Sequence, residues 1–144
     1  MPIQKPTDQD SDASILILRD GKARFLKSSD TRASLRHFAV IMKDAGSLTA
    51  EYGNTLFPRD EPYEFAFPRD EDMHRGNIDY RDEKGVYFIK PTSGKFFVVS
   101  KEAGPLDTYI NYITYVNLKF EFEGQELTIN GTGEATFVFN RQPS

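Results

Sequence analysis

The sequence predicts a mostly β domain, an antiparallel β-sandwich or small closed barrel with at most one helix at about residues 30–45. Three observations support this fold class. Apolar and polar residues alternate with a period of two along the C-terminal third, which is typical of half-buried strands. Turn residues that include glycine separate these segments. The aromatic share is 13%, with twelve Phe and seven Tyr, and this favours a packed core over a disordered chain.

The chain of 144 residues is expected to form one β-rich domain over residues 14–141. A mobile N-terminal tail is expected over 1–13, where Pro and Asp punctuate a polar segment, and a short tail over 142–144. The sequence contains no cysteine, which excludes disulfides, thiolate metal sites and cysteine nucleophiles in this chain.

The first expected element is a hairpin near the N-terminus. Ile15–Leu18 and Ala23–Leu26 are short apolar-rich segments on either side of Asp20-Gly21. The Asp-Gly pair tolerates the positive φ angles that a tight two-residue turn requires. The two segments are therefore expected to pair as antiparallel strands.

Residues 30–45 are compatible with either a helix or a strand. Four apolar residues fall at i, i+3, i+4 and i+7, the spacing of one helical face: Leu35, Phe38, Ala39 and Met42. Ser29 or Asp30 could cap the start of a helix, and Gly46 could end it. Phe38–Met42 is also a continuous apolar run of the kind that a fully buried strand uses. The helix is the favoured interpretation of the two.

Two further elements are expected in the middle of the chain. Tyr63–Phe67 alternates in polarity between Pro62 and Pro68, and prolines at both ends favour a short edge strand. Val86–Ile89 and Phe96–Val99 flank a loop that contains Pro and Gly, and we expect them to pair as a second hairpin.

The C-terminal part of the sequence predicts an antiparallel meander. Thr108–Tyr115 is rich in Tyr, Ile and Thr and could continue through a bulge into the strand Val116–Phe122. A turn at Glu123-Gly124 leads to a strand from Leu127, and a last strand follows the Gly-rich residues 130–133. Four phenylalanines of the meander are expected in the core: Phe120, Phe122, Phe137 and Phe139.

The candidate ligand-binding residues are three tyrosines and two arginines. Tyr109, Tyr112 and Tyr115 recur every three residues, and tyrosine suits binding surfaces because its apolar ring carries a polar tip. Arg59 and Arg69 occupy matching positions in a repeated Phe-Pro-Arg-Asp-Glu pentapeptide, whose two copies flank the expected edge strand. Each copy would present one arginine and two carboxylates to a ligand. The alternatives are core tyrosines and two similar solvated turns.

Asp70, Asp72 and Asp79 are the candidate metal ligands, with calcium as the ion, and no other cofactor is expected. They belong to the densest group of oxygen-bearing side chains in the sequence. The segment departs from the EF-hand pattern, because His74 and Arg75 stand where that pattern has an acidic residue and a glycine. An acidic loop partly neutralised by its arginines is the competing interpretation.

Charge is unevenly distributed along the chain. Arg19–Lys43 holds seven basic and two acidic residues, whereas Phe57–Gly85 holds nine acidic and five basic ones, and the formal net charge is −4. A two-fold homodimer would place each acidic segment against the partner's basic one. No nucleic-acid partner is expected, because the chain lacks clustered basic runs. No membrane-spanning segment and no signal peptide is visible, so a cytoplasmic location is expected.

The sequence favours a non-enzymatic binding or interaction module that recognises a protein or small ligand through loops of the sandwich or barrel. No catalytic residue is assigned, because no Gly-x-Ser-x-Gly elbow is present and nothing marks a nucleophile beside His37 or His74. The alternative is a small cofactor-independent barrel enzyme that uses carboxylate and Tyr groups in a pocket. A deep apolar cavity with converging acidic or histidine side chains would favour the enzyme.

Overall fold

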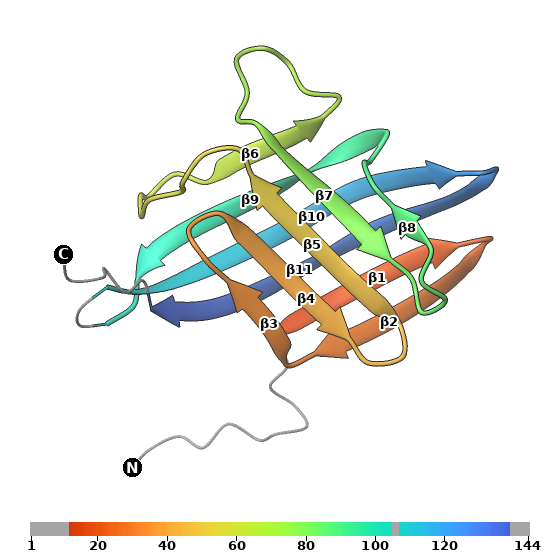
Figure 1. The fold of residues 1–144 in the computed structure, drawn as a ribbon, viewed down its shortest axis with the longest axis horizontal. Coiled ribbons are helices and arrows are strands. Elements are labelled where there is room, and N and C mark those ends of the chain that lie inside the picture. Colours follow the sequence, from red (N-terminus) through yellow and green to blue (C-terminus); the bar gives the residue numbers. More distant parts are fainter. Residues whose placement is uncertain (1–11, 105–106, 139–144) are drawn as a thin grey trace.

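The computed structural model describes residues 12–104 and 107–138, and these residues form eleven strands in two antiparallel sheets (Figure 1). Sheet A has six strands in the order β2-β1-β11-β10-β9-β6. Its strands are β2 (Lys22–Ser28), β1 (Ala13–Arg19), β11 (Gln125–Val138), β10 (Thr108–Phe122), β9 (Ser93–Glu102) and β6 (Tyr63–Phe67). Sheet B has five, in chain order: β3 (Asp30–Ala33), β4 (His37–Met42), β5 (Gly46–Tyr52), β7 (Gly76–Arg81) and β8 (Tyr87–Phe88).

The two sheets pack face to face as a β-sandwich and do not close into a barrel. Each sheet keeps two separate edges, formed by β2 and β6 in sheet A and by β3 and β8 in sheet B. In Figure 1 the strands of sheet B cross those of sheet A at a large angle. The sandwich is one of the two architectures that the sequence predicts, and the edge position of β6 confirms the expectation for Tyr63–Phe67.

Apolar side chains from both sheets fill the space between them. The inner faces contribute a continuous set of buried residues, among them Ile15, Ile17, Phe38, Val40, Leu48, Phe65, Phe88, Phe96, Val98, Ile113, Phe120, Leu127 and Ile129. Several of the aromatic rings stack on one another, as Phe65 does on Phe96 with ring centroids 4.6 Å apart. The sandwich interior is therefore a filled core.

Both tight hairpins that the sequence predicts are present. Asp20 and Gly21 have φ angles of 53° and 74°, and Glu123 and Gly124 have φ angles of 50° and 78°. Two consecutive positive φ angles match the right-handed twist of the flanking strands. The turns join β1 to β2 and β10 to β11.

A bulge in β10 keeps its apolar side chains directed at the core. Two residues of β10, ending at Asn117, lie opposite the single Asn130 of β11. The Asn117 backbone N–H donates to Asn130 Oδ1 at 2.9 Å, and Asn117 has a positive φ of 48°. A Cβ on Gly94 of the neighbouring strand would lie 2.1 Å from the Asn117 carbonyl oxygen, so only glycine fits there. The extra residue shifts the alternation of inward and outward side chains by one position. Tyr115 and Leu118 are therefore both buried, although they are three residues apart.

Residues 30–45 form β3 and β4 rather than the favoured helix. In β4 the buried side chains are Phe38, Val40 and Met42, which follow a period of two. This strand pairs with β3 on one side and β5 on the other and lies against sheet A. A short apolar run fits both periods, and the strand partners on each side decide between them.

Two other expectations about strand pairing are wrong. Val86–Ile89 and Phe96–Val99 form no hairpin, because β8 pairs with β7 in sheet B while β9 lies between β6 and β10 in sheet A. Residues 130–133 do not separate two strands, because β11 runs without interruption from Gln125 to Val138. Alternating polarity identifies a strand but does not identify its partner.

The four phenylalanines expected in the core have different environments. Phe120 is fully buried, whereas Phe122 is 42% exposed and Phe137 is half-buried. Phe122 lies at the end of β10 beside the β10–β11 turn, although its ring still approaches Phe88 (6.1 Å between centroids). Phe139, residues 1–11 of the expected N-terminal tail and the expected tail over 142–144 lie outside the described residues.

Candidate functional site

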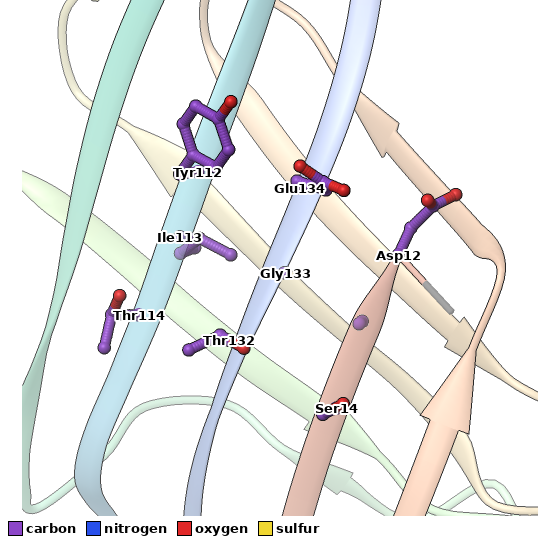
Figure 2. A pocket seen from close by; sticks show the side chains of 9 residues that line it. Asp12, Ser14, Tyr112, Ile113, Thr114, Thr132, Gly133 and Glu134 are labelled. Carbon is purple, nitrogen blue, oxygen red and sulfur yellow. The ribbon is translucent and has the colours of Figure 1, made fainter. Parts of the chain in front are cut away.

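A hollow of about 300 Å³ lies on the outer face of sheet A, where β10, β11 and β1 run side by side (Figure 2). Nine residues line it: Asp12, Ala13, Ser14, Tyr112, Ile113, Thr114, Thr132, Gly133 and Glu134. Ala13 and Ile113 are buried and belong to the core side of the sheet. A Cβ on Gly133 would likewise contact the inward Phe38 ring at 3.3 Å. The side chains that face the hollow from outside are therefore the six others.

The strand register arranges these six side chains in two rows across the strands. Thr114, Thr132 and Ser14 are direct cross-strand neighbours and form a row of three short hydroxyl side chains. Tyr112 lies opposite Glu134, whose backbone N–H donates to the Asp12 carbonyl oxygen at 2.7 Å, and these three form the second row. Figure 2 shows the second row, whose side chains are longer, along one side of the hydroxyl row. The hollow is thus a short groove with a hydroxyl floor and one taller wall.

The groove offers a definite set of chemical contacts. Its hydroxyls can both donate and accept hydrogen bonds, and the Asp12 and Glu134 carboxylates accept them. Tyr112 is exposed and presents an aromatic ring. No Lys, Arg or His is among the nine lining residues, and Glu134 contributes a carboxylate. This composition disfavours an anionic ligand.

The three candidate tyrosines do not form one surface. Tyr109 is half-buried, with its ring 5.6 Å from that of Phe137, and Tyr115 is buried in the core. Residues six apart share a face of a strand, so Tyr109 and Tyr115 both lie on the inner side, while Tyr112 lies on the outer side. Of the three, only Tyr112 lines the groove.

Arg59 and Arg69 each support the turn in which they lie. The Arg59 guanidinium donates to the carbonyls of Glu61 and Pro62, both at 2.9 Å, and stacks 3.7 Å above the Tyr63 ring. Arg69 donates to the carbonyls of Met73 and Glu71 in its own loop, both at 3.2 Å. The two copies of the pentapeptide lie at opposite ends of β6, their arginines bond differently placed carbonyls, and neither arginine lines the groove.

The candidate metal ligands are not gathered in one place. Asp70 and Asp72 are exposed in the loop before β7, where Asp70 O accepts the Met73 N–H at 3.0 Å, while Asp79 lies in β7 on the outer face of sheet B. Burial and the nearby Glu51 carboxylate raise the pKa of Asp79. Within residues 12–104 and 107–138, no group of three or more acidic or histidine side chains could hold a metal ion. Calcium binding stays a prediction.

A serine–histidine contact occurs at the β3–β4 turn, and the sequence analysis did not anticipate it. Ser34 Oγ lies 2.6 Å from His37 Nδ1, and both residues are at the surface. The same Oγ also accepts the backbone N–H groups of Arg36 and His37 at 3.1 Å each. A hydroxyl that accepts two backbone hydrogen bonds stabilises a turn. Among the residues that the structure describes, no hydrogen bond orients the imidazole from its other side, as a catalytic triad requires.

Basic and acidic segments of the chain pair with each other within one molecule. Arg19 Nη1 lies 3.2 Å from the buried Asp82 Oδ2, and Arg24 Nη1 lies 3.7 Å from Glu83 Oε1. Asp82 Oδ1 also accepts the backbone N–H groups of Lys84 and Val86, both at 2.9 Å. Asp82 and Glu83, which follow β7, are thus paired with basic residues of β1 and β2.

The homodimer expected from the charge distribution stays a prediction. If the remaining basic side chains of Arg19–Lys43 meet the acidic segment of a second copy, the dimer should weaken as salt rises from about 0.05 to 0.5 M, because the screening length shrinks roughly threefold. Light scattering across that range measures the association. A monomer at low salt would contradict the prediction, and a dimer indifferent to salt would indicate an apolar interface.

No family model, no curated protein and no solved structure matches this chain. In the part of the chain that the structure describes, no helix has the length and apolar character needed to cross a membrane. Function therefore has to be argued from the chemistry of the surface.

Proposed function

We propose that the chain is a non-enzymatic binding module whose ligand lies in the groove on the outer face of sheet A. The observation that carries this proposal is the juxtaposition of the hydroxyl row Thr114, Thr132 and Ser14 with Tyr112 and Glu134 on three adjacent strands. Side chains on paired strands above a filled core are held in fixed relative positions, which lowers the entropy cost of binding. The proposed surface lies on strands rather than on the loops that the sequence suggested.

The ligand that best complements the groove is an uncharged, hydroxyl-rich molecule such as an oligosaccharide. Strand spacing is about 5 Å, so the three hydroxyls of the floor extend over about 10 Å, a length that suits an extended ligand. Ligand hydroxyls can donate to the Glu134 carboxylate and exchange hydrogen bonds with the floor. The Tyr112 ring offers an apolar face for the C–H side of a sugar ring.

The enzyme alternative has less support. Glu134 and Tyr112 supply groups capable of acid–base chemistry, but the groove is open to solvent. Catalytic electrostatics gain most of their strength where water is excluded. The sandwich interior, which is shielded from bulk solvent, is occupied mostly by packed apolar side chains.

The test is a binding titration with a panel of neutral oligosaccharides, containing α- and β-linked glucans, mannans and N-acetylglucosamine oligomers. Trilysine and triglutamate serve as charged comparisons. At least one neutral member should bind, and Tyr112→Ala and Glu134→Gln should each weaken it roughly tenfold, through a lost ring contact and a lost charge-assisted hydrogen bond.

The matched control is Tyr87→Ala, which removes an exposed tyrosine on sheet B. It should leave the affinity unchanged. Failure of every oligosaccharide to bind, or equal losses in Tyr112→Ala and Tyr87→Ala, would contradict the proposal. If only trilysine binds, and Glu134→Gln abolishes this binding, the groove is the binding surface but its ligand is cationic, which contradicts the proposed ligand class.

A further inference from the structure

Within the part of the chain that the structure describes, four side chains inside the sandwich bury polar atoms that have no hydrogen-bond partner. They are Tyr52, Ser100, Asn111 and Tyr115, with exposed fractions of 3%, 0%, 0% and 2%. The three hydroxyls and the Asn111 amide oxygen make no hydrogen bond to any residue that the structure describes. Such atoms are rare in folded proteins, because a polar group that loses its bonds to water on burial normally gains others.

These four side chains are neighbours across the interior. Ser100 of β9 lies directly opposite Asn111 of β10 in sheet A. Burial raises the pKa of the Tyr52 hydroxyl on β5, and the adjacent Asn111 side chain partly lowers it again, although the two do not have the geometry of a hydrogen bond. Burial, together with the nearby Tyr52, raises the pKa of the Tyr115 hydroxyl. Asn111 thus lies beside Ser100 and near Tyr52, which in turn lies near Tyr115, and we call these four side chains the interior polar cluster.

The cluster joins the two sheets and contains both donors and acceptors. Sheet A contributes Ser100, Asn111 and Tyr115, and sheet B contributes Tyr52. Asn111 Nδ2 donates to the Ser34 carbonyl oxygen at 3.4 Å, which leaves Asn111 Oδ1 as an acceptor within the cluster. The three hydroxyls can each donate or accept. A water molecule, with two donors and two acceptor sites, complements this set.

We propose that Tyr52, Ser100, Asn111 and Tyr115 bind at least one internal water molecule that bridges sheet A to sheet B. Buried waters typically make about three hydrogen bonds to polar groups that lack other partners, and this cluster supplies four such groups. Hydrogen bonds are directional, whereas apolar contacts are not. A water bridge would therefore fix both the separation of the two sheets and their lateral position at this point. It does not depend on the proposed function of the outer groove.

The test uses Tyr52→Phe and Tyr115→Phe, which remove a hydroxyl and keep the ring. If the hydroxyls bind water, each variant should reduce the ratio of folded to unfolded protein by roughly fivefold and lower the midpoint of urea unfolding. The double variant should cost less than the sum of the two, because both hydroxyls contact the same water network. If the hydroxyl instead has no hydrogen-bond partner, its removal should raise the midpoint of urea unfolding, because the variant no longer buries a polar group without a hydrogen bond.

Two controls calibrate the measurement. Tyr80→Phe removes a buried hydroxyl that donates to the Ala45 carbonyl oxygen at 2.8 Å and should lower the midpoint. Tyr87→Phe removes an exposed hydroxyl and should leave it unchanged. A high-resolution crystal structure should show ordered water within hydrogen-bonding distance of at least two of the four atoms. An unchanged or higher midpoint in either cluster variant, or a cost without ordered water at the site, would overturn the proposal.

Discussion

Replacement of Phe120 by alanine is expected to lower the free energy of unfolding by about 3–5 kcal/mol. Phe120 is 0% exposed, and its ring meets that of Phe88 edge-on from the opposite sheet, with centroids 6.4 Å apart. Truncation removes this inter-sheet contact and leaves a cavity in a core that is closed on both sides. Urea unfolding followed by circular dichroism measures the loss.

Phe122 provides the matched control for this experiment. It lies two residues further along the same strand and also approaches Phe88, but it is 42% exposed. Because water already reaches its ring, Phe122→Ala should cost only about 1 kcal/mol. Equal losses in the two variants would show that burial is not what distinguishes them, and a loss below about 1 kcal/mol for Phe120→Ala would contradict the assignment of the strand faces.

Asp82→Ala is expected to cost about 3 kcal/mol, the second largest effect. The carboxylate is 3% exposed and accepts hydrogen bonds from Arg19 and from the backbone N–H groups of Lys84 and Val86. Its removal leaves the two amides and the guanidinium without their acceptor. Glu83→Ala is the control, because its ion pair with Arg24 is at the surface and such pairs contribute little.

The contribution of Asp82 should depend on pH. Burial alone would raise its pKa, but the Val86 N–H, the Arg19 guanidinium and the Lys84 N–H outweigh burial and hold the pKa below its ordinary value. The stability that the charged form provides is therefore present above the unfolded pKa of about 3.9 and is lost as pH falls through the lower folded value. The difference in unfolding free energy between wild type and Asp82→Asn should be constant near neutrality and shrink below about pH 4. A difference that persists unchanged in acid would contradict this account.

Local sequence signals predicted the parts of the fold that depend on adjacent residues. Asp20-Gly21 and Glu123-Gly124 fix two hairpins, because the required φ angles restrict the residue types. The same signals failed for residues 30–45, where the spacing of the apolar residues favoured a helix although the run Phe38–Met42 also fits a strand. They failed again for β8 and β9, whose partners lie in different sheets.

The candidate site was predictable only in part for the same reason. Tyr112 was singled out from composition and spacing, and it does line the groove. Ser14, Thr132 and Glu134 were not, because they join Tyr112 only through the pairing of β1 with β11 and of β11 with β10. Asn111 likewise resembles a solvent-facing polar residue in sequence, yet its position on the inner face places it in the core.

The most direct test of ligand binding on sheet A is an amide correlation NMR titration of the full chain with the tightest-binding neutral oligosaccharide of the panel. The backbone signals of Tyr112–Thr114 and Thr132–Glu134, which line the groove, should shift together in proportion to occupancy. Signals from the outer face of sheet B, such as those of Thr49 and Asp79, should stay in place. Shifts centred on sheet B or on the loops that contain Arg59 and Arg69, with the groove signals unmoved, would contradict the proposed binding surface.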